Sequence, residues 1–494
     1  MYSSKRRMKL FRHPSWSGGP VILTSSDTVG DVYIIKYDTT GTPQWGRRIG
    51  SAGTDIGTSV STDSDGNIYV TGTYTDTLTV YKIDNTTSFI SFAFTGSIGT
   101  FVVKYNQGGT PLWARRVNTP GSISATGITT DSSGNVYITG NISGTASIYN
   151  ADNSTVFATS SGNSNSILLI KYDTTGTPQW VRRIQGAYEL AFGVSTDSSG
   201  NVYLSGFTTS STVYFYGAPS TSIQMSANSN RDGFFVKYDT TGQPQWVRRI
   251  GGLNFDDNPN GISIDPSGNI YLCGDTECNP FIIYDTDNTT TFASFDKPDG
   301  GFGGFVVKYD NTGAPQWVRK MTAPGRDVRA TAISADPLGN TYVSGTYNIA
   351  ALIIFNSNNS TTFATLTSSG SIDSFIIKYD TTGAPQWARK IGATLSDRAT
   401  GISTDSNGNA YVTGNYTSTP VTIFNTNNTS TFATLERSGT TNSFVVKYDT
   451  IGTPQWARKI GGTGAENSYG ISTHSSGNTY VTGTYTSTSL TVSV

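Results

Sequence analysis

The chain has 494 residues, a formal net charge of −1 at pH 7 and only 14 % charged residues. No run is long and apolar enough to predict a helix that crosses a membrane. Histidine occurs twice, as His13 and His474, so no nucleophile–histidine–acid triad can be assembled and no catalytic residue is expected. Composition therefore favours a non-enzymatic protein.

A ten-residue phrase, Lys-Tyr-Asp-Thr-Thr-Gly-Thr-Pro-Gln-Trp with small changes, recurs seven times at intervals of 66 to 71 residues. The seven copies end at Trp45, Trp113, Trp180, Trp246, Trp317, Trp387 and Trp456. A period this regular indicates a repeat architecture and overrides the several domains that the length alone would suggest.

The repeat over 123–184 contains four predicted strands in chain order. Residues 126–130 form the first and lead through the Asp-x-x-Gly-Asn turn 131–135 to the second, 136–140. Residues 166–172 form the third, and a second tight turn leads to the fourth, 179–184. Seven units of four antiparallel strands predict an all-β, seven-bladed β-propeller of about 69 residues per blade.

The chain ends divide one blade between them. The first repeat opens with its third and fourth strands (31–37 and 44–49), and the last repeat ends with its first and second (469–473 and 478–484). We therefore expect both termini to share one blade, which closes the ring. The expected domains are a basic N-terminal tail, 1–18, and a single propeller, 19–494.

An insert between the second and third strands of each complete repeat predicts a β-hairpin. Apolar residues stand eight apart in it and are expected to face each other across the hairpin. The pairs are Tyr81/Phe89, Tyr149/Phe157, Phe215/Ile223, Tyr284/Phe292, Phe355/Phe363 and Phe424/Phe432. The segments 488–494 and 20–26 look like the two arms of a seventh hairpin, so we expect the termini to meet at its tip.

Two phrases, Asp131-Ser-Ser-Gly-Asn-Val-Tyr-Ile-Thr-Gly140 and Phe444-Val-Val-Lys-Tyr-Asp449 followed by Pro-Gln-Trp, resemble the SBBP-type β-propeller repeats of bacterial surface proteins and large DNA viruses. The resemblance covers the chain from about residue 20. It implies the propeller fold and no shared catalytic set. Asn106 and His474 depart from the pattern, each replacing an Asp. The Asp-Thr-Thr-Gly-x-x-x-Trp phrase is also similar to the docking motif of quinoprotein dehydrogenases, but it is one residue shorter and no cofactor ligands accompany it. No cofactor is expected.

Fourteen cations follow the repeat tryptophans as pairs, such as Arg47-Arg48 and Arg389-Lys390. We expect the fourth strand to be the outer edge of each blade, where charge discourages pairing with another chain. The alternative is a basic rim that binds nucleic acid or anionic glycans. The tryptophans are expected to pack between neighbouring blades.

An acidic residue recurs eight positions before the Asp, or His474, that directly follows the first strand, as Asp55, Glu189, Asp257, Asp397 and Glu466. Each is interpreted as a local cap on loop amides. The alternative is a ring of carboxylates at the channel mouth that binds a cation, a basic peptide or a glycan.

One repeat is unusually acidic and carries both cysteines, Cys273 and Cys278. Two thiols are too few for a four-ligand zinc site, so reduced thiols are expected, with a local disulfide as the alternative. Weak candidates for a metal site are Asp256, Asp257, Asp275 and Glu277. The first interpretation of this acidic blade is that its carboxylates pair with Arg326, Arg329 and Arg398 of the next loops, and the metal site is the alternative.

Several Asn-x-Ser/Thr sequons fall at hairpin tips, and five of them are interpreted first as Asn-rich turns, with exposed glycan acceptors as the alternative. These five begin at Asn85, Asn153, Asn288, Asn359 and Asn428. The N-terminal tail has the composition of an anchor for nucleic acid, lipid head groups or an acidic partner, and it does not resemble a secretory signal. Its cations are Lys5, Arg6, Arg7, Lys9 and Arg12.

These features together predict a binding or structural propeller that presents its hairpins on one face to a protein partner, in a virion or at a cell surface. The alternatives are a lectin-like or hydrolytic propeller that uses the channel mouth, and a nucleic-acid-binding propeller that uses the basic rim.

Overall fold

The computed structural model describes residues 20–25, 29–94, 96–162, 165–218, 221–227, 231–252, 256–296, 301–348 and 351–493. The expected tail and its five cations lie outside these residues. Within them the chain is all-β, and none of the described residues is helical. Consequently no helix in the described part is long and apolar enough to cross a membrane.

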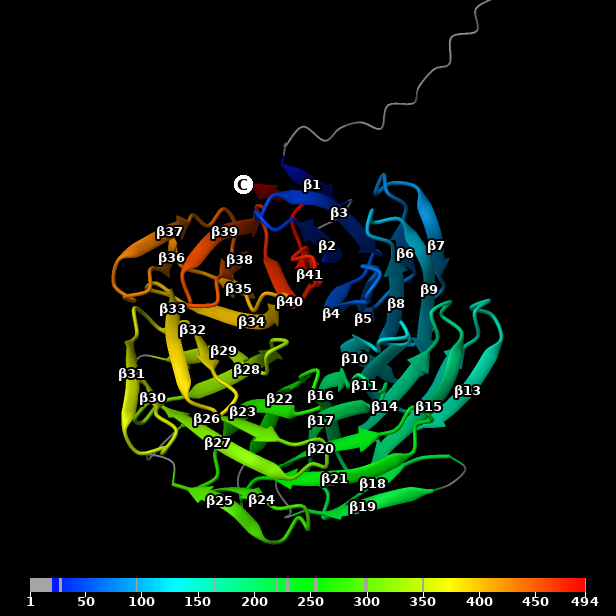
Figure 1. Cartoon of the computed structure of the whole chain (residues 1–494). Helices are drawn as coiled ribbons and strands as arrows, with labels where there is room; N and C mark the ends of the chain where they lie inside the picture. The colour runs from blue at the N-terminus through cyan, green and yellow to red at the C-terminus, as the bar shows by residue number, and fades with distance from the viewer. Residues whose placement is uncertain are drawn as a thin grey trace, which may run out of the picture.

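Seven sheets, the blades, surround a central axis (Figure 1). From the innermost strand outward, blade 1 contains β4 (Ile56–Thr62), β5 (Ile68–Tyr74), β8 (Gly99–Tyr105), β9 (Pro111–Asn118), β12 (Thr145–Tyr149) and β13 (Val156–Ser161). Blade 2 contains β10 (Ser122–Thr130), β11 (Val136–Ser143), β14 (Ser166–Tyr172), β15 (Pro178–Gln185), β18 (Thr212–Tyr216) and β19 (Ser222–Ser226). Blade 3 contains β16 (Glu189–Thr196), β17 (Val202–Thr208), β20 (Asp232–Tyr238), β21 (Pro244–Ile250), β24 (Phe281–Tyr284) and β25 (Thr291–Phe295).

The remaining four blades repeat this order. Blade 4 contains β22 (Asp257–Ile264), β23 (Ile270–Thr276), β26 (Gly303–Tyr309), β27 (Pro315–Thr322), β30 (Ala351–Phe355) and β31 (Thr362–Thr367). Blade 5 contains β28 (Val328–Ala335), β29 (Thr341–Asn348), β32 (Ile372–Tyr379), β33 (Pro385–Gly392), β36 (Val421–Phe424) and β37 (Thr431–Leu435). Blade 6 contains β34 (Asp397–Thr404), β35 (Ala410–Tyr416), β38 (Asn442–Tyr448), β39 (Pro454–Gly461), β42 (Ser489–Ser493) and β1 (Val21–Thr24). Blade 7 contains β40 (Glu466–Thr473), β41 (Thr479–Tyr485), β2 (Asp31–Tyr37), β3 (Pro43–Gly50), β6 (Leu78–Tyr81) and β7 (Ser88–Phe92).

The seven-bladed propeller, the four strands predicted for each blade and the ring closure are confirmed. Each sheet has six strands because a hairpin adds two to the four. Blade 7 takes its two inner strands from the C-terminal end of the chain and its next two from the N-terminal end. The seventh hairpin is also formed by both ends, because β1 pairs antiparallel with β42, Val21 opposite Val492. Each terminus is thus held by a sheet, and no blade boundary is left open.

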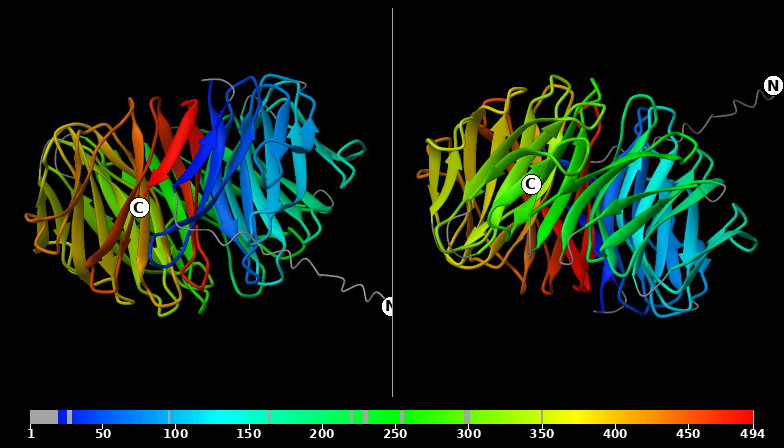
Figure 2. Two further views of the ribbon diagram at one scale, coloured as in Figure 1. Left: turned by 90° about the horizontal axis from the view of Figure 1, so that it is seen from above. Right: turned by 90° about the horizontal axis from the view of Figure 1, so that it is seen from below.

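Each predicted hairpin joins the blade that precedes its own repeat. The insert between the second and third strands of blade 2, for example, forms β12 and β13 and extends the sheet of blade 1 along β9. The hairpins therefore form the outermost layer of the ring, visible at the periphery of Figure 1 and in the edge-on views of Figure 2. Every repeat holds its neighbour by this strand exchange, so the hairpins are not presented on one face as expected.

The hairpin registers differ from the expected facing pairs. Phe215 and Ile223 are direct partners, as predicted. In the other five hairpins a β-bulge follows the tip, so the first aromatic of each pair faces the residue that precedes the second; Phe424, for example, faces Thr431 rather than Phe432. In the hairpin of blade 7, for example, the tip 82–87 is closed by a bond from Lys82 N to Thr87 O, and Tyr81 pairs with Ser88 while Val80 pairs with Ile90. Phe89 is therefore the extra residue of the bulge.

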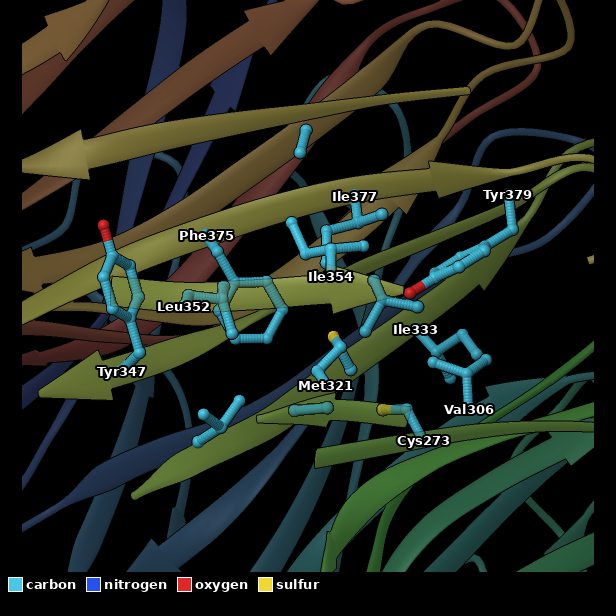
Figure 3. Close-up of a cluster of buried hydrophobic side chains, with 14 of the residues drawn as sticks. Cys273, Val306, Met321, Ile333, Tyr347, Leu352, Ile354, Phe375, Ile377 and Tyr379 are labelled. Atoms are coloured by element: carbon cyan, nitrogen blue, oxygen red, sulfur yellow. The ribbon is translucent and has the colours of Figure 1, made fainter. Parts of the chain in front are cut away.

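The core lies between blades rather than within them. In the cluster of Figure 3, Leu352 and Ile354 come from the hairpin of blade 4, whereas Ile333 and Tyr347 come from blade 5. All four side chains are buried. Burial of this apolar surface between sheets is the main favourable term in holding the ring together.

Candidate functional site

The first cation of each pair joins two blades. The Arg47 side chain donates from Nε to the carbonyl oxygen of Gly109, at 2.6 Å, and from Nη2 to that of Gly108, in the next blade. The same bond from Nε to a turn glycine, at 2.6 to 2.9 Å, is made by all seven first arginines: Arg47, Arg115, Arg182, Arg248, Arg319, Arg389 and Arg458. These cations satisfy backbone carbonyls that a close turn would otherwise leave unpaired.

In six of the seven pairs the second cation lies over an aromatic ring of the hairpin. The Arg48 guanidinium lies 4.8 Å from the Tyr81 ring, and Lys390 Nζ lies 4.3 Å from the Phe424 ring. None of the fourteen paired cations is exposed. The expected outer edge is therefore wrong, because the hairpins cover the fourth strands, and the paired cations do not form a basic rim for nucleic acid.

The tryptophans pack between blades, as predicted. Trp113 contacts Tyr69 of its own blade and Tyr172 of the next, with ring centroids 6.0 and 6.5 Å apart. Its Nε1–H donates to the Thr174 carbonyl oxygen at 3.1 Å, and Lys104 Nζ donates to the same oxygen at 3.3 Å. The recurring phrase therefore forms the contact between two neighbouring blades. Its Lys and Trp, and the Arg two residues after the Trp, bind the Asp-Thr-Thr-Gly turn of the next blade.

The sequon asparagines clamp the hairpin tips onto the fourth strands. Asn428 has φ +57° and its side-chain amide spans two backbone groups of β33, accepting from Lys390 N at 3.0 Å and donating to Ala388 O at 3.0 Å. Asn85, Asn288 and Asn359 make the same pair of bonds, and Asn153 makes the donated one. Because Nδ2 is already bonded to a carbonyl, these tips are structural turns rather than exposed glycan acceptors.

The five recurring carboxylates do not face the channel mouth. Asp55, Glu189, Asp257, Asp397 and Glu466 are all fully buried. Asp397 accepts from the backbone N–H of Ala393 and from Ser418 Oγ, both at 2.7 Å. Burial raises the pKa of each of the five, to about 8 for Asp55 and to about 7 for Asp257. The local-cap interpretation fits these contacts, and a carboxylate ring that binds a cation, a basic peptide or a glycan does not.

A hydroxyl or thiol two residues beyond the second strand completes most of these caps. Ser210, Ser418 and Ser487 bond Glu189, Asp397 and Glu466 respectively, and Cys278 Sγ lies 3.0 Å from Asp257 Oδ2. Blade 1 has Asp76 at this position, which cannot donate, and Asp55 Oδ2 is buried without a hydrogen bond among the described contacts. Burial is the main cause that raises the pKa of Asp55, and the nearby Asp31 charge adds to it.

The acidic side chains of blade 4 go to separate partners. Asp256 forms an ion pair with Arg231 at 3.0 Å, and Asp275 accepts from Asn258 and Asn260 at 3.0 and 2.6 Å. Glu277 is half-buried, and its backbone N–H donates to the Asp256 carbonyl oxygen. Within the described ranges no group of three or more His, Cys, Asp or Glu side chains could hold a metal ion. Both cysteines are buried free thiols, as expected.

The first strands of the blades differ from one another in a few side chains that line pockets, some of them near the loops that cross from one blade to the next. Arg329 of blade 5 and Arg398 of blade 6 line one pocket of about 220 Å³, together with Asp327, Thr346 and Asn348. Deeper in the channel a cavity of about 260 Å³ is lined by Phe192 and Tyr469 where four other blades place Thr58, Thr126, Thr331 and Thr400. The sequence reading missed this aromatic pair, although aligning the seven first strands would have exposed it.

Repeated four-stranded blades around a channel, joined at identical Trp-containing boundaries, define a β-propeller repeat protein. The SBBP family, described as a beta-propeller repeat, matches residues 44–73, 112–145, 245–282 and 386–418. Each match runs from a fourth strand into the first two strands of the next blade. These four places of the chain therefore match the SBBP beta-propeller repeat, and the fold around them is a seven-bladed propeller.

One similar curated protein is the "Uncharacterized WD repeat-containing protein L264" of Acanthamoeba polyphaga mimivirus. It is 26 % identical over 524 residues, which cover 94 % of this chain and 38 % of the viral protein. The chain thus spans 38 % of the length of that relative.

Two solved structures have low similarity to this fold. The Dos1 propeller has a TM-score of 0.37 at 8 % identity and covers 92 % of this chain and 96 % of its own. Rhamnogalacturonan lyase YesW has a TM-score of 0.27 at 10 % identity and covers 88 % of this chain and 90 % of its own. At these scores the likeness says nothing about activity.

Proposed function

We propose that this propeller is a non-enzymatic binding module that recognises a protein partner on the face of the crossing loops. The observation that carries the proposal is the Arg329/Arg398 pocket. The recurring cations are engaged between blades, whereas these two arginines belong to no repeat motif and stand on neighbouring blades.

The two guanidinium groups are held without being neutralised. Arg398 is exposed, and its Nε donates to the neutral Ser396 Oγ at 3.0 Å. Arg329 lies 3.9 Å above the Phe302 ring, and its contact with Asp327 is long, at 3.9 Å. An exposed ion pair of this kind contributes little, so Arg329 keeps its capacity for a ligand.

An acidic loop of a partner protein fits this arrangement. Arginine forks bind carboxylates through paired hydrogen bonds, and arginine is enriched at protein interfaces. A rigid ring also reduces the ordering cost of association, because its loops are already positioned. The viral source of the similar curated protein supports a particle or surface setting for such a module.

The test is quantitative capture of cross-linked partners from the native source with three proteins: the wild type, R329A/R398A, and R437A as a control. Arg437 is a partly exposed arginine in the loop after β37, where it bonds Thr419 and Thr440, and it does not line the Arg329/Arg398 pocket. Partners whose cross-links map to blades 5 and 6 should be lost with R329A/R398A and kept with R437A. Equal capture by all three proteins would refute the proposal.

A second candidate function is glycan binding in the channel. Phe192 and Tyr469 provide aromatic faces there, and Thr58, Thr126 and Asn260 provide polar groups. Saturable binding of a soluble oligosaccharide panel that is lost in Y469A would support it, and an unchanged response in Y469A would remove it.

A further inference from the structure

The outer groove of blade 2 differs from its equivalents. This groove, about 620 Å³, is lined by Phe157 to Ser161 of β13, by Gln179 to Arg183 of β15, and by Tyr216 to Ala218 at the end of β18. The equivalent groove of blade 5 is about 360 Å³, and its lining includes Asn428. The groove of blade 2 is larger because its own hairpin does not fill it.

The residues that flank the hairpin tip of blade 2 bond to the next blade. The tip sequence has no asparagine, and β18 and β19 pair without the bulge found in the other five continuous hairpins. The Thr221 hydroxyl donates to Gln243 Oε1 at 2.7 Å, and the Gln243 amide donates to Ala218 O at 2.5 Å. Both described flanks of the tip are thus held on Gln243, in the third-to-fourth-strand turn of blade 3, and no tip asparagine is available for β15.

The N–H of Arg183 and the carbonyl of Val181 in β15 are consequently not clamped by a tip asparagine. The Val181 oxygen accepts from Arg182 Nη1 at 2.8 Å, as the Ala388 oxygen does from Arg389 Nη1, and like the Ala388 oxygen it has a second lone pair for a further donor. Arg183 and Val181 occupy the positions of Lys390 and Ala388 in β33, where Asn428 accepts from the N–H of one and donates to the carbonyl of the other. Among the described contacts no side-chain amide lies on Arg183 N or Val181 O. The groove therefore presents one donor and one acceptor at the spacing that fits a carboxamide.

The walls of the groove suit a protein loop. Phe157 is 39 % exposed beside the two backbone groups, so an apolar neighbour of the carboxamide would cover it. The Arg183 guanidinium is 4.9 Å from the Tyr216 ring and bonded to the Ser161 carbonyl oxygen, so it forms part of the wall.

We propose that the blade 2 groove binds the side-chain carboxamide of an asparagine or glutamine on a partner-protein loop, in the way that this chain's own hairpin tips bind their strands. Five sister hairpins of this chain place an Asn amide on the equivalent strand, which shows the kind of group that this strand surface binds. The proposal is independent of the Arg329/Arg398 pocket, which lies on another surface.

The probe is a fluorescein-labelled peptide copying residues 421–435, cyclised by an added terminal disulfide, and its partner is the full chain. Binding is measured by fluorescence anisotropy, with the N428A peptide as the matched control. Loss of two hydrogen bonds should weaken the control peptide about tenfold. Equal affinities, or no binding of the asparagine peptide, would overturn the proposal.

Two protein variants locate the binding. In the first, residues 217–221 are replaced by a copy of 425–430, so that the chain's own tip occupies the groove. In the second, the exposed Thr159 in the groove wall is changed to Trp, which fills it without disturbing the core. Both should abolish binding of the asparagine peptide, and full binding to either folded variant would place the peptide elsewhere.

Discussion

Asp55 makes the stability of the propeller depend on pH in a direction opposite to that of ordinary surface carboxyls. Its pKa is about 8 in the folded chain and 3.8 ordinarily, because burial beside Asp31 penalises the charged form. A raised folded-state pKa gives stability that is fully present below the unfolded value and is lost as pH rises through the folded value. Wild-type stability should therefore fall between mildly acidic and mildly basic pH.

The magnitude follows from the proton that must be released. Between the two pKa values each pH unit costs about 1.4 kcal/mol per such carboxyl, so Asp55 contributes a loss of about 2.7 kcal/mol from about pH 5 to about pH 7. Asp257 and Asp373, whose pKa values are about 7 and about 6, add to the wild-type slope. The change D55N removes the Asp55 part and should flatten the slope by about 1.4 kcal/mol per unit.

Urea unfolding followed by tryptophan fluorescence across this pH range measures the slope. D84N is the matched control, since the exposed Asp84 accepts bonds from Thr87 and Thr86 that hold its pKa well below the usual range. Its stabilising effect is lost as pH falls, so D84N should leave the slope above about pH 5 unchanged. Parallel profiles of wild type and D55N would refute the reasoning.

Three further predictions concern the blade boundaries, and each is checked by urea unfolding near neutral pH. D76S should stabilise the chain by about 1 kcal/mol, because it supplies Asp55 with the hydroxyl that Ser418 gives Asp397; no gain would contradict the cap. N428A should cost about 1–3 kcal/mol because Lys390 N loses the acceptor supplied by Asn428 and Ala388 O loses one of its two side-chain donors, keeping Arg389 Nη1, and a neutral effect would mean that the tip is not clamped. R389A should cost about 3 kcal/mol because it removes a guanidinium that bonds three carbonyl oxygens, those of Gly452, Ile451 and Ala388, the last of which keeps Asn428 Nδ2 as a donor. The exposed R398A should stay within about 0.5 kcal/mol; equal losses would refute the division between structural and available arginines.

The sequence determined the number of blades and the closure of the ring because both follow from the count and order of repeated strands. It located the tryptophans between blades, since an indole beside a buried strand needs an apolar neighbour and a hydrogen-bond acceptor. It could not say which sheet each hairpin extends. Tyr81 and Phe89 show that a hairpin forms, but not that Arg48 of the preceding blade will lie on Tyr81.

For the same reason, the sequence alone leads to a wrong interpretation of the repeated charged residues. Arg47 and Arg48 are consistent with charges on an exposed edge strand that discourage pairing with another chain. In the structure a hairpin strand pairs with their strand and covers it, and Arg47 bonds the next blade. Asp397 looks like part of a ring until Ser418 and the Ala393 amide are found around it. Polar residues that recur in every repeat of this propeller form the contacts that are repeated within and between its blades. Residues that break the repeat, such as Arg398 or the missing tip asparagine of blade 2, are the better guide to binding.

Site-resolved amide hydrogen exchange by NMR tests the central claim, that tip asparagines clamp the hairpins of blades 3, 4, 5 and 7 on both a backbone N–H and a carbonyl, and that the hairpin of blade 2 has no such clamp. The amides to compare are Arg48, Arg249, Lys320 and Lys390, which bond to a tip asparagine, and Arg183, which occupies the same position without one. The account predicts slow exchange at the first four and much faster exchange at Arg183. Equal protection at all five amides would contradict both the clamp and the open groove.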